Sequence, residues 1–220
     1  QGVESFLCSL VKYALYVLLL FLILSGFGVT TGSVVAVIGS AGLTIGLALQ
    51  GSLTNFAGGV LILLLHPFRV GDYIINGGGG QEGTVTAITI FYTKLLTADN
   101  RMELIPNGTL SNSSITNVSQ MPKRRNDIPV GISYSASLDV AKEVLQKLAA
   151  SDAYVLQEEP VNVFVNALGD SSVDLVLRVW VKSENYWAAK WQLTEQVKRE
   201  FDAAGVEIPF PQLDVHTRND

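Results

Sequence analysis

The stretch AGLTIGLALQGSLTNFAGGVLILLL, residues Ala41–Leu65, contains no charged side chain, and small residues recur along it at helical spacing. It is the last part of an uncharged run of 53 residues, Tyr13–Leu65. A helix needs about 20 predominantly apolar residues to cross the hydrocarbon core of a bilayer. The run therefore predicts membrane-crossing helices rather than the core of a soluble protein.

The charged residues of the chain are concentrated after this run. Of the 15 basic and 20 acidic side chains in 220 residues, only Glu4 and Lys12 lie within residues 1–66. Residues 67–220 hold the other 14 basic and 19 acidic ones, a net charge of −5. We expect a membrane segment followed by a soluble module, and the acidic balance argues against a nucleic-acid partner.

The chain offers little for catalysis or metal binding. One cysteine, Cys8, cannot form an internal disulfide or a thiolate metal cluster. His66 and His216 lie far apart and beside no matching acid or thiol, so a metal centre or a Ser-His-Asp site is not expected. We predict no enzymatic activity, no cofactor and no metal. Scattered acids near turns are read as solvated: Asp72, Asp99, Glu103 and Asp127.

The membrane segment divides into two crossings and a shorter helix. The run Val3–Leu24 is rich in leucine and aromatic residues, as is typical of a helix facing lipid. Ser25–Ser33 reads as a turn, and Val34–Leu49 forms the second crossing. Ser52–Leu65 resembles an interfacial amphipathic helix more than a third crossing, and His66-Pro67 ends it. Positively charged flanks favour the cytoplasm, so we expect the soluble module there.

At about 100° per residue, the second crossing sorts into distinct faces. Leu43 and Leu47 lie on one face, opposite a broad apolar face that contains Ile45 and Leu49. Two stripes of small residues flank the two leucines, namely Gly39, Gly42 and Gly46 on one side and Ala36, Ser40 and Thr44 on the other.

This layout favours a ring of helices around an axis. Small residues let helix backbones approach closely in a membrane, so each glycine stripe can pack against the neighbour's second stripe. Leu43 and Leu47 then project toward the axis, and a narrow apolar ring closes a pore by expelling water. The alternative is a single close contact between two helices of one chain or of a dimer.

Gly51 separates the second crossing from the amphipathic piece. Glycine costs about 1 kcal/mol relative to alanine in a helix interior, so Gly51 predicts a break or kink. The alternative is an ordinary glycine that only allows close helix packing.

The soluble module divides into two parts with different sequence patterns. From Phe68 to Asn117, short alternating runs broken by Gly, Asp and Asn predict the strands of a small β-barrel. Gly77–Gly80 reads as a hairpin tip rather than a phosphate loop, because no Lys-Ser/Thr pair follows. The rest predicts a ferredoxin-like α+β layer in the order β-α-β-β-α. Its expected elements are Asp127–Ser133, a helix capped by Ser137 and running to Ala150, Val161–Ala167, Ser172–Lys182 and a helix over Glu184–Ala204.

The last helix ends at Gly205, which suits a left-handed terminal residue. We expect Trp187, Trp191, Val197 and Phe201 to share one stripe of it. The tail from Phe210 to His216 reads as one more strand.

Four segments resemble the mechanosensitive channel of small conductance (MscS) family: Ala41–Ile75, Ile105–Asn117, Lys123–Arg125 and Lys198–Val215. The resemblance implies a homoheptamer with two leucine rings in its pore helix. It also implies that the cytoplasmic β-domain and α/β-domain enclose a vestibule with side portals, and that C-terminal strands close the base as a small barrel. Members have at least one membrane helix before the two seen here, so we expect that residue 1 is not the native start.

The resemblance also assigns residues. Leu43 and Leu47 match the family's gate leucines, Gly51 its hinge glycine and Gly59 the second glycine of the same helix. The family's usual ridge alanines are Ser40 and Thr44 here, which puts the closed-state packing in question. Lys123-Arg124-Arg125 either attracts anions toward the vestibule or is a solvated turn.

The predicted architecture is a membrane α-helical plus α+β protein in a ring-shaped homo-oligomer. Its parts are transmembrane helices with a kinked pore helix (1–66), a small β-barrel domain (67–122), a ferredoxin-like domain (123–209) and a C-terminal strand (210–220). The predicted function is a tension-gated channel of the inner membrane that contacts lipid and passes ions and small osmolytes on hypo-osmotic shock. The alternative is a non-channel membrane receptor or assembly protein whose soluble module binds a partner.

Overall fold

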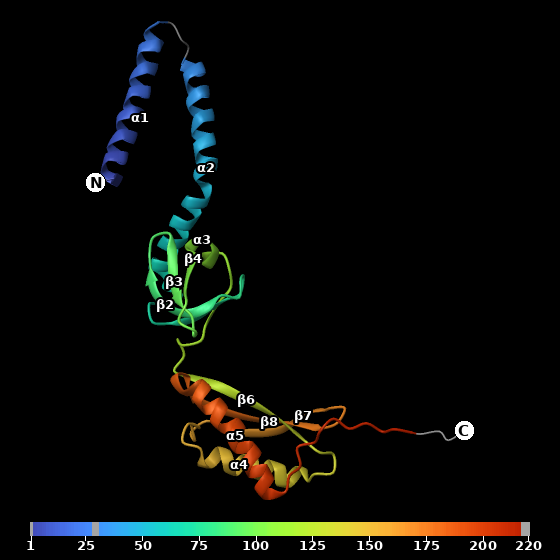
Figure 1. Cartoon of the computed structure of the whole chain (residues 1–220). Helices are drawn as coiled ribbons and strands as arrows, with labels where there is room; N and C mark the ends of the chain where they lie inside the picture. Colours follow the sequence, from blue (N-terminus) through green and yellow to red (C-terminus); the bar gives the residue numbers. More distant parts are fainter. Residues whose placement is uncertain (1, 28–30, 217–220) are drawn as a thin grey trace. The chain divides into compact units, whose positions relative to one another are not determined.

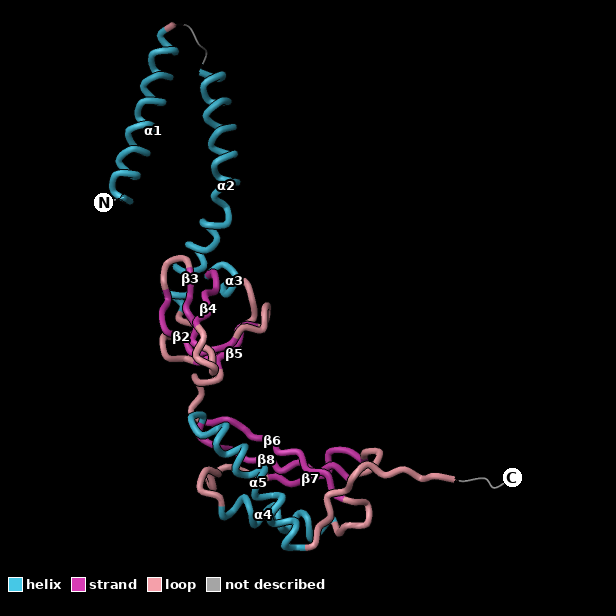
Figure 2. Tube along the Cα trace, viewed as in Figure 1, coloured by secondary structure: helices cyan, strands magenta, loops and turns pink. Residues whose placement is uncertain are grey.

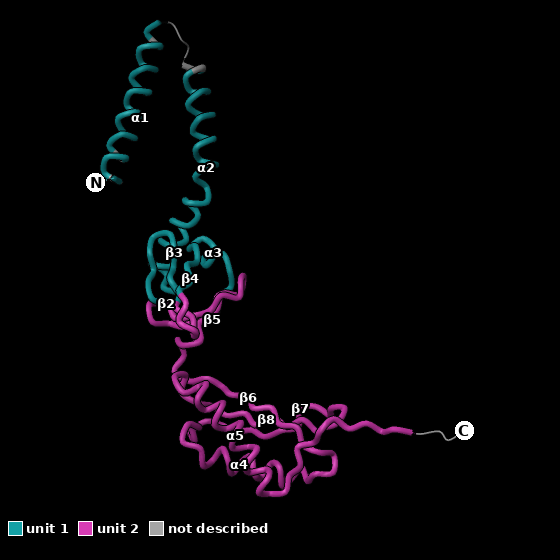
Figure 3. Tube along the Cα trace, in the orientation of Figure 1, with its two compact units in different colours: residues 1–67, 86–95, 102–114 teal, residues 68–85, 96–101, 115–220 magenta. Residues whose placement is uncertain are grey.

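The structure, a computed structural model, describes residues 2–27 and 31–216. The chain divides into two compact units (Figure 3). Unit 1 contains residues 1–67, 86–95 and 102–114, and unit 2 contains residues 68–85, 96–101 and 115–220. Two later segments, 86–95 and 102–114, therefore belong to one unit with the two N-terminal helices.

Two long helices form the N-terminal part of unit 1. Helix α1 spans Gly2–Gly26 and helix α2 spans Thr31–Leu65, and both are long and apolar enough to cross a membrane. Each helix runs into the predicted turn, so the turn is shorter than Ser25–Ser33. Residues 28–30 of that turn lie outside the described part of the chain.

Helix α2 is continuous over 35 residues, and hydrogen-bonded helix runs through Gly51 and Gly59. The predicted amphipathic helix Ser52–Leu65 is therefore the continuation of the second crossing rather than a separate element. The helix axis nevertheless changes direction between its straight first part and the part beside β3 and α3 (Figures 1 and 2). The helix ends where His66 adopts a left-handed φ of 47° and Pro67 follows.

A five-stranded sheet follows in the order β4-β3-β2-β1-β5. Its strands are β1 (Tyr73–Asn76), β2 (Glu82–Ile88), β3 (Tyr92–Leu96), β4 (Met102–Pro106) and β5 (Ile115–Asn117), with the short helix α3 (Asn107–Ser111) after β4. Strand β2 passes through both units, and β1 pairs antiparallel with both β2 and β5.

The four glycines Gly77–Gly80 join β1 to β2, as predicted for a hairpin tip. The buried Asn76 organises this turn, since its side-chain oxygen accepts from Gly78 N and its side-chain nitrogen donates to Gln81 Oε1. Gly80 adopts a φ of 70°, a conformation that glycine reaches without strain.

The C-terminal part of unit 2 has the predicted element order. Strand β6 (Lys123–Ile132), helix α4 (Leu138–Ser151), strands β7 (Asn162–Leu168) and β8 (Val173–Lys182) and helix α5 (Tyr186–Ala204) follow one another, with a short 3₁₀ turn before α5. The antiparallel sheet has the order β6-β8-β7. Ser137 caps α4 and Gly205 ends α5 with a φ of 68°, both as predicted.

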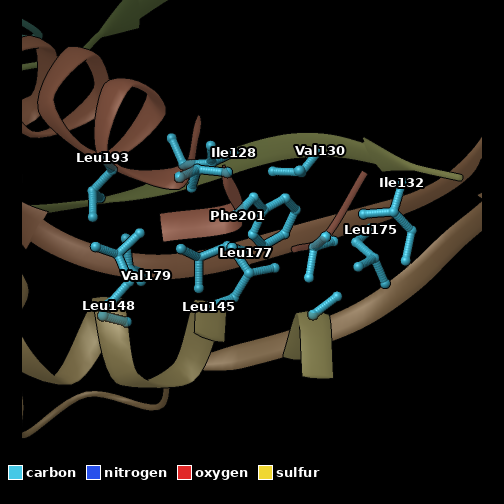
Figure 4. Close-up of a cluster of buried hydrophobic side chains, with 14 of the residues drawn as sticks. Ile128, Val130, Ile132, Leu145, Leu148, Leu175, Leu177, Val179, Leu193 and Phe201 are labelled. Carbon is cyan, nitrogen blue, oxygen red and sulfur yellow. The ribbon is translucent and has the colours of Figure 1, made fainter. Parts of the chain in front are cut away.

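Both helices cover one face of this sheet (Figure 4). Alternate residues of β8 point into the shared core, where Leu175, Leu177 and Val179 meet Leu145 and Phe201 with no exposed surface. Burying each such side chain contributes roughly 1.5–3 kcal/mol. This layer is therefore a well-packed core.

The predicted stripe of α5 is wrong in part. Val197 and Phe201 are buried, but Trp187 and Trp191 are 55% and 67% exposed. The core side of α5 instead follows strict four-residue spacing through Ala189, Leu193, Val197 and Phe201. The two tryptophans lie outside this stripe and stack on each other, with ring centroids 5.9 Å apart.

The uncovered face of the sheet carries a carboxylate held by two arginines. Asp127 accepts two hydrogen bonds from Arg178, at 2.9 Å each, and two from Arg125, at 3.0 and 3.2 Å. The hydrogen bonds from Arg178 hold the pKa of Asp127 below its usual value, and the charge of Arg125 also lowers this pKa. This carboxylate therefore stabilises the fold above the ordinary pKa of an aspartate, and the contribution is lost as the pH falls through its lowered pKa.

The tail after α5 forms no strand within the described residues 206–216. Phe210, Leu213 and Val215 are all more than 70% exposed. The described tail makes isolated hydrogen bonds instead, from Ser133 N to the carbonyl of Glu207 and from Gln212 N to Ser171 Oγ. The C-terminal strand therefore stays a prediction about the assembled protein.

We predict that Arg178→Met lowers the thermal stability at neutral pH by about 2–5 °C. The difference in melting temperature from wild type should narrow as the pH falls below the ordinary pKa of an aspartate toward the lowered pKa of Asp127, because protonation of Asp127 removes its ion pair with Arg178. Thermal unfolding of the full-length protein in detergent at several pH values measures this. Arg199→Met is the matched control, because Arg199 only pairs with Glu195 one turn away on α5. A pH-independent gap for Arg178→Met would contradict the role of Asp127.

Candidate functional site

The first part of α2 is uncovered in the single chain. Every residue from 35 to 54 is exposed, and Leu43 and Leu47 are 65% and 63% exposed. A water-soluble protein does not leave a continuous apolar helix surface of this size uncovered. Lipid or other copies of the chain must therefore cover this surface.

The glycine stripe has no partner inside the chain. A Cβ built at Gly39, Gly42 or Gly46 would meet no other atom within 4 Å in the described structure. A close contact with α1 would bring neighbouring atoms near these positions. The alternative of a small-residue contact between two helices of one chain is therefore not what the described residues form.

The second stripe keeps its polar groups bonded to its own helix. Ser40 Oγ donates to the carbonyl of Val37, and Thr44 Oγ1 donates to the carbonyl of Ser40, both at 2.9 Å. A hydroxyl that already donates to its own backbone needs no partner across an interface. Ser40 and Thr44 therefore leave this stripe fit to pack against an apolar neighbour.

Gly51 is likewise unconstrained by contacts. A Cβ at this position would meet nothing within 4 Å, so no close approach within the chain requires glycine there. The structure thus places Gly51 on the exposed part of a continuous helix. Its role as a hinge stays a prediction.

The last turns of α2 are anchored by direct backbone contact, unlike the first part. A Cβ at Gly58 would lie 2.6 Å from the carbonyl oxygen of Asn107, and one at Gly59 would lie 2.1 Å from the carbonyl oxygen of Ile90. Real Cβ atoms do not approach other atoms so closely. Both positions therefore require glycine for packing.

A hydrogen bond reinforces this anchor. Asn55 Oδ1 accepts from the backbone N–H of Gly108 at 2.9 Å, and a Cβ at Gly108 would lie 2.8 Å from the same oxygen. The rings of Phe56 and Phe91 also meet, with centroids 6.3 Å apart. One side of the α2 end thus contacts both α3 and the turn between β2 and β3.

Asn107 fixes the surface that receives α2. Its side chain is fully buried and donates to the carbonyls of Thr89 and Ile90, at 2.8 and 3.0 Å. Its side-chain oxygen accepts from Thr93 Oγ1 at 2.8 Å, and its backbone N–H donates to the carbonyl of Phe91. A buried polar group with all partners satisfied holds its neighbours in one arrangement.

Sequence reasoning found Gly59 but missed the other members of this anchor. The contacts join Asn55 to Gly108 and Gly58 to Asn107. The two residues of each pair lie about fifty positions apart, so helical periodicity cannot reveal the contact. The usable signal is the Gly58-Gly59 pair in an otherwise bulky apolar run, because paired glycines in a helix indicate close approach of another backbone. Asn107-Gly108 at the end of a strand is the matching signal.

The described residues of the site offer small side chains and exposed apolar surface for packing. Within residues 2–27 and 31–216, no group of three His, Cys, Asp or Glu side chains is placed to hold a metal ion. The predicted gate residues Leu43 and Leu47 lie two turns or more before the anchor on the same continuous helix. One continuous helix therefore connects these residues to the β2–β3–β4 part of unit 1.

Two family models match the chain after Gln50. One, described as the mechanosensitive ion channel β-domain, matches residues 51–120, and the other, the C-terminal domain of the mechanosensitive ion channel MscS, matches residues 126–208.

Similar proteins cover nearly the whole chain. A small-conductance mechanosensitive channel of Edwardsiella ictaluri is 46% identical over 97% of this chain and 74% of its own length. A channel of the same description from Helicobacter pylori is 31% identical over 98% of this chain and 80% of its own length.

Solved structures agree with these relatives. The closed-state crystal structure of Helicobacter pylori MscS superposes with a TM-score of 0.83 at 32% identity, covering 90% of this chain and 78% of that one. Arabidopsis thaliana MSL1, at 21% identity and a TM-score of 0.76, covers 92% of this chain and 75% of its own and shares the fold. The chain therefore belongs to the MscS family of mechanosensitive ion channels.

Proposed function

We propose that seven copies of this chain form a ring in which the α2 helices line a pore opened by membrane tension. The observation that supports this most directly is the exposed face of Leu43 and Leu47, flanked by two small-residue stripes without intrachain partners. Each glycine stripe packs against the Ala36, Ser40 and Thr44 stripe of the next copy. Leu43 and Leu47 then form two apolar rings around the axis.

The closed state depends on water leaving a narrow apolar constriction. A ring of leucines gives water no hydrogen-bond partner, so the constriction empties and ions do not pass. Widening the ring lets water return, and ions and small osmolytes follow. Release of these solutes protects the cell against hypo-osmotic shock.

Membrane tension does work in proportion to the in-plane area gained on opening. Most described side chains of helix α1 are exposed, so in the bilayer this apolar helix faces lipid and moves outward with the stretched membrane. Its connection to α2 draws the pore helix outward. The anchor at Asn55, Gly58 and Gly59 holds the other end of α2, so tension acts on a helix fixed at one end.

The chain sits in the inner membrane, with the module after α2 in the cytoplasm. Lys12 and Arg69 flank the two crossings on one side, as the positive-inside rule requires. In the assembled ring, the cytoplasmic domains enclose a vestibule and the tails from residue 210 pair as strands of a small barrel. Patch-clamp of the full-length protein in liposomes under suction tests the function, and a cross-linking ladder that stops at two would contradict the ring.

The gate assignment predicts that Leu47→Ser opens the channel at lower tension or makes it leak at rest. A leucine-sized apolar surface is worth roughly 1.5–3 kcal/mol per side chain, and every subunit contributes one. The serine hydroxyl also gives water a partner in the constriction. The measurement is the suction at which the channel opens, compared between patches of Leu47→Ser and wild type under the same protocol.

Leu49→Ser is the matched control. It makes the same chemical change on the broad apolar face, so it should disturb packing without producing a leak. Equal thresholds for Leu47→Ser and wild type would refute the gate, as would an equal leak from Leu49→Ser.

The anchor predicts that Gly59→Ala destabilises the protein by about 1–3 kcal/mol, the usual cost of overpacking. The added methyl falls on the carbonyl oxygen of Ile90, and backbone cannot move aside as a side chain does. Gly51→Ala adds the same methyl where it meets nothing within 4 Å, so it should not destabilise the chain. Hydrogen exchange at the amides of Asn107 and Gly108 reports opening of the anchor, and unchanged protection in Gly59→Ala would exclude this role.

The hinge hypothesis makes a separate prediction for Gly51→Ala. Alanine favours a straight helix by about 1 kcal/mol per subunit. The variant should therefore change entry into desensitised or inactivated states more than the opening threshold. Sustained and ramped suction on the same patch separate these quantities, and a shift confined to the threshold would reject the hinge.

A further inference from the structure

Two polar side chains continue the face of α2 that carries Leu43 and Leu47. Gln50 lies seven residues after Leu43, and Thr54 lies seven residues after Leu47. Seven residues make about two turns of an α-helix, so each polar residue lies within about 20° of its leucine around the helix. The helix is continuous over these positions, and both polar residues are exposed. The leucine face of α2 therefore becomes polar toward the anchor.

The change from apolar to polar takes place within one turn of the helix. At about 1.5 Å per residue, Gln50 lies about 4.5 Å beyond Leu47 along the axis of α2, and Thr54 lies about 6 Å further on. The polar groups thus follow the second leucine at once, on the side of the anchor.

The side-chain amide of Gln50 has no hydrogen-bond partner among the residues that the structure describes. An amide carries two donor hydrogens and an acceptor oxygen, and leaving them unpaired in hydrocarbon costs free energy. In a membrane helix such a side chain faces water or another part of the protein rather than lipid. Its position on the leucine face directs Gln50 toward the axis of the proposed ring, where water enters the open pore.

Thr54 offers the pore a different set of groups. Its Oγ1 donates a hydrogen bond to the backbone carbonyl of Gln50 at 2.9 Å. A hydroxyl has one hydrogen, so this oxygen has only its lone pairs left for other groups, and lone pairs favour cations. The amide of Gln50, by contrast, has an oxygen for cations and N–H groups for anions.

We infer that Gln50, with Thr54 one turn further on, forms a polar ring at the mouth of the leucine constriction, where passing ions exchange part of their hydration shell for amide groups. This inference rests on the ring of α2 helices proposed above. Rings of polar or charged groups discriminate between ions through the charge that they present. An uncharged amide serves ions of both signs, so Gln50 keeps the preference between cations and anions small.

The test replaces Gln50 by residues of opposite charge in the full-length channel. Gln50→Glu should raise the K⁺/Cl⁻ permeability ratio about threefold or more, and Gln50→Lys should lower it about threefold or more, because one charge per subunit then surrounds a narrow passage. Reversal potentials of suction-activated currents in asymmetric KCl measure this ratio in liposome patches. Shifts of opposite sign at one position exclude a general effect of misfolding.

Ser52 provides the matched control. It is exposed, and it lies two residues after Gln50 and about 160° away from it around the helix. Ser52→Glu and Ser52→Lys therefore add the same charges at nearly the same depth but away from the axis. Both variants should keep the wild-type permeability ratio.

A second measurement does not depend on selectivity. Cys8 is the only cysteine of the chain, so Gln50→Cys in a Cys8→Ser background carries a single thiol. A charged methanethiosulfonate reagent added during sustained suction should block most of the current of this variant. The same reagent should leave the current of Ser52→Cys in that background unchanged.

The outcomes separate this inference from the proposed function. Wild-type currents whose permeability ratio neither Gln50→Glu nor Gln50→Lys changes would overturn the polar ring and leave the channel intact. Equal shifts from the Gln50 and Ser52 variants would overturn it too, because they would report total charge rather than a ring at the axis. If the charged variants do not assemble, an unmodified current in Gln50→Cys contradicts the ring. A wild-type protein without suction-activated current would instead refute the proposed function itself.

Discussion

The contact on which the rest of unit 1 depends is the direct approach of α2 backbone to the backbone of Ile90 and Asn107. Glycine at positions 58 and 59 removes the side chains that would keep these segments apart. Asn107 then holds the receiving surface by bonding three separate carbonyl or hydroxyl groups around it. This buried amide ties the turn after β2 to the start of α3, of which Asn107 is the first residue.

This contact gives α2 two different environments along one helix. Its last turns are fixed to folded protein, whereas residues 35–54 are all exposed. A helix that is bound at one end and uncovered at the other transmits force along its axis. The uncovered part carries the small-residue stripes and the two leucines, so the residues proposed to gate are those with freedom to move.

The sequence predicts most of the architecture because its signals are local. Fifty-three uncharged residues predict the membrane helices, and capping at Ser137 and Gly205 predicts the helix ends. The exposure of Trp187 and Trp191 could not be predicted from the sequence. The apolar residues of α5 cover a wide arc of the helix, and the sequence does not reveal which part of that arc faces the sheet.

Local sequence signals also could not predict the anchor or the residue at which the second crossing ends. A single glycine costs only about 1 kcal/mol in a helix interior, so Gly51 does not by itself end a helix of 35 residues. The partner of Asn55 lies fifty-three residues away, beyond any local signal. The faces of α2 that meet other copies are predictable from angular spacing alone, but which copy they meet is a property of the assembly.

The self-contained hydroxyls of Ser40 and Thr44 bear on the biogenesis of the protein. A hydroxyl whose hydrogen-bond partner lies on another subunit would be unsatisfied in a lone helix, and this would raise the free energy of inserting that helix into the bilayer. Here each hydroxyl is satisfied by its own backbone at 2.9 Å before any neighbour arrives. Newly made chains can thus enter the bilayer singly, and oligomerisation can follow as a separate step driven by packing of stable helices.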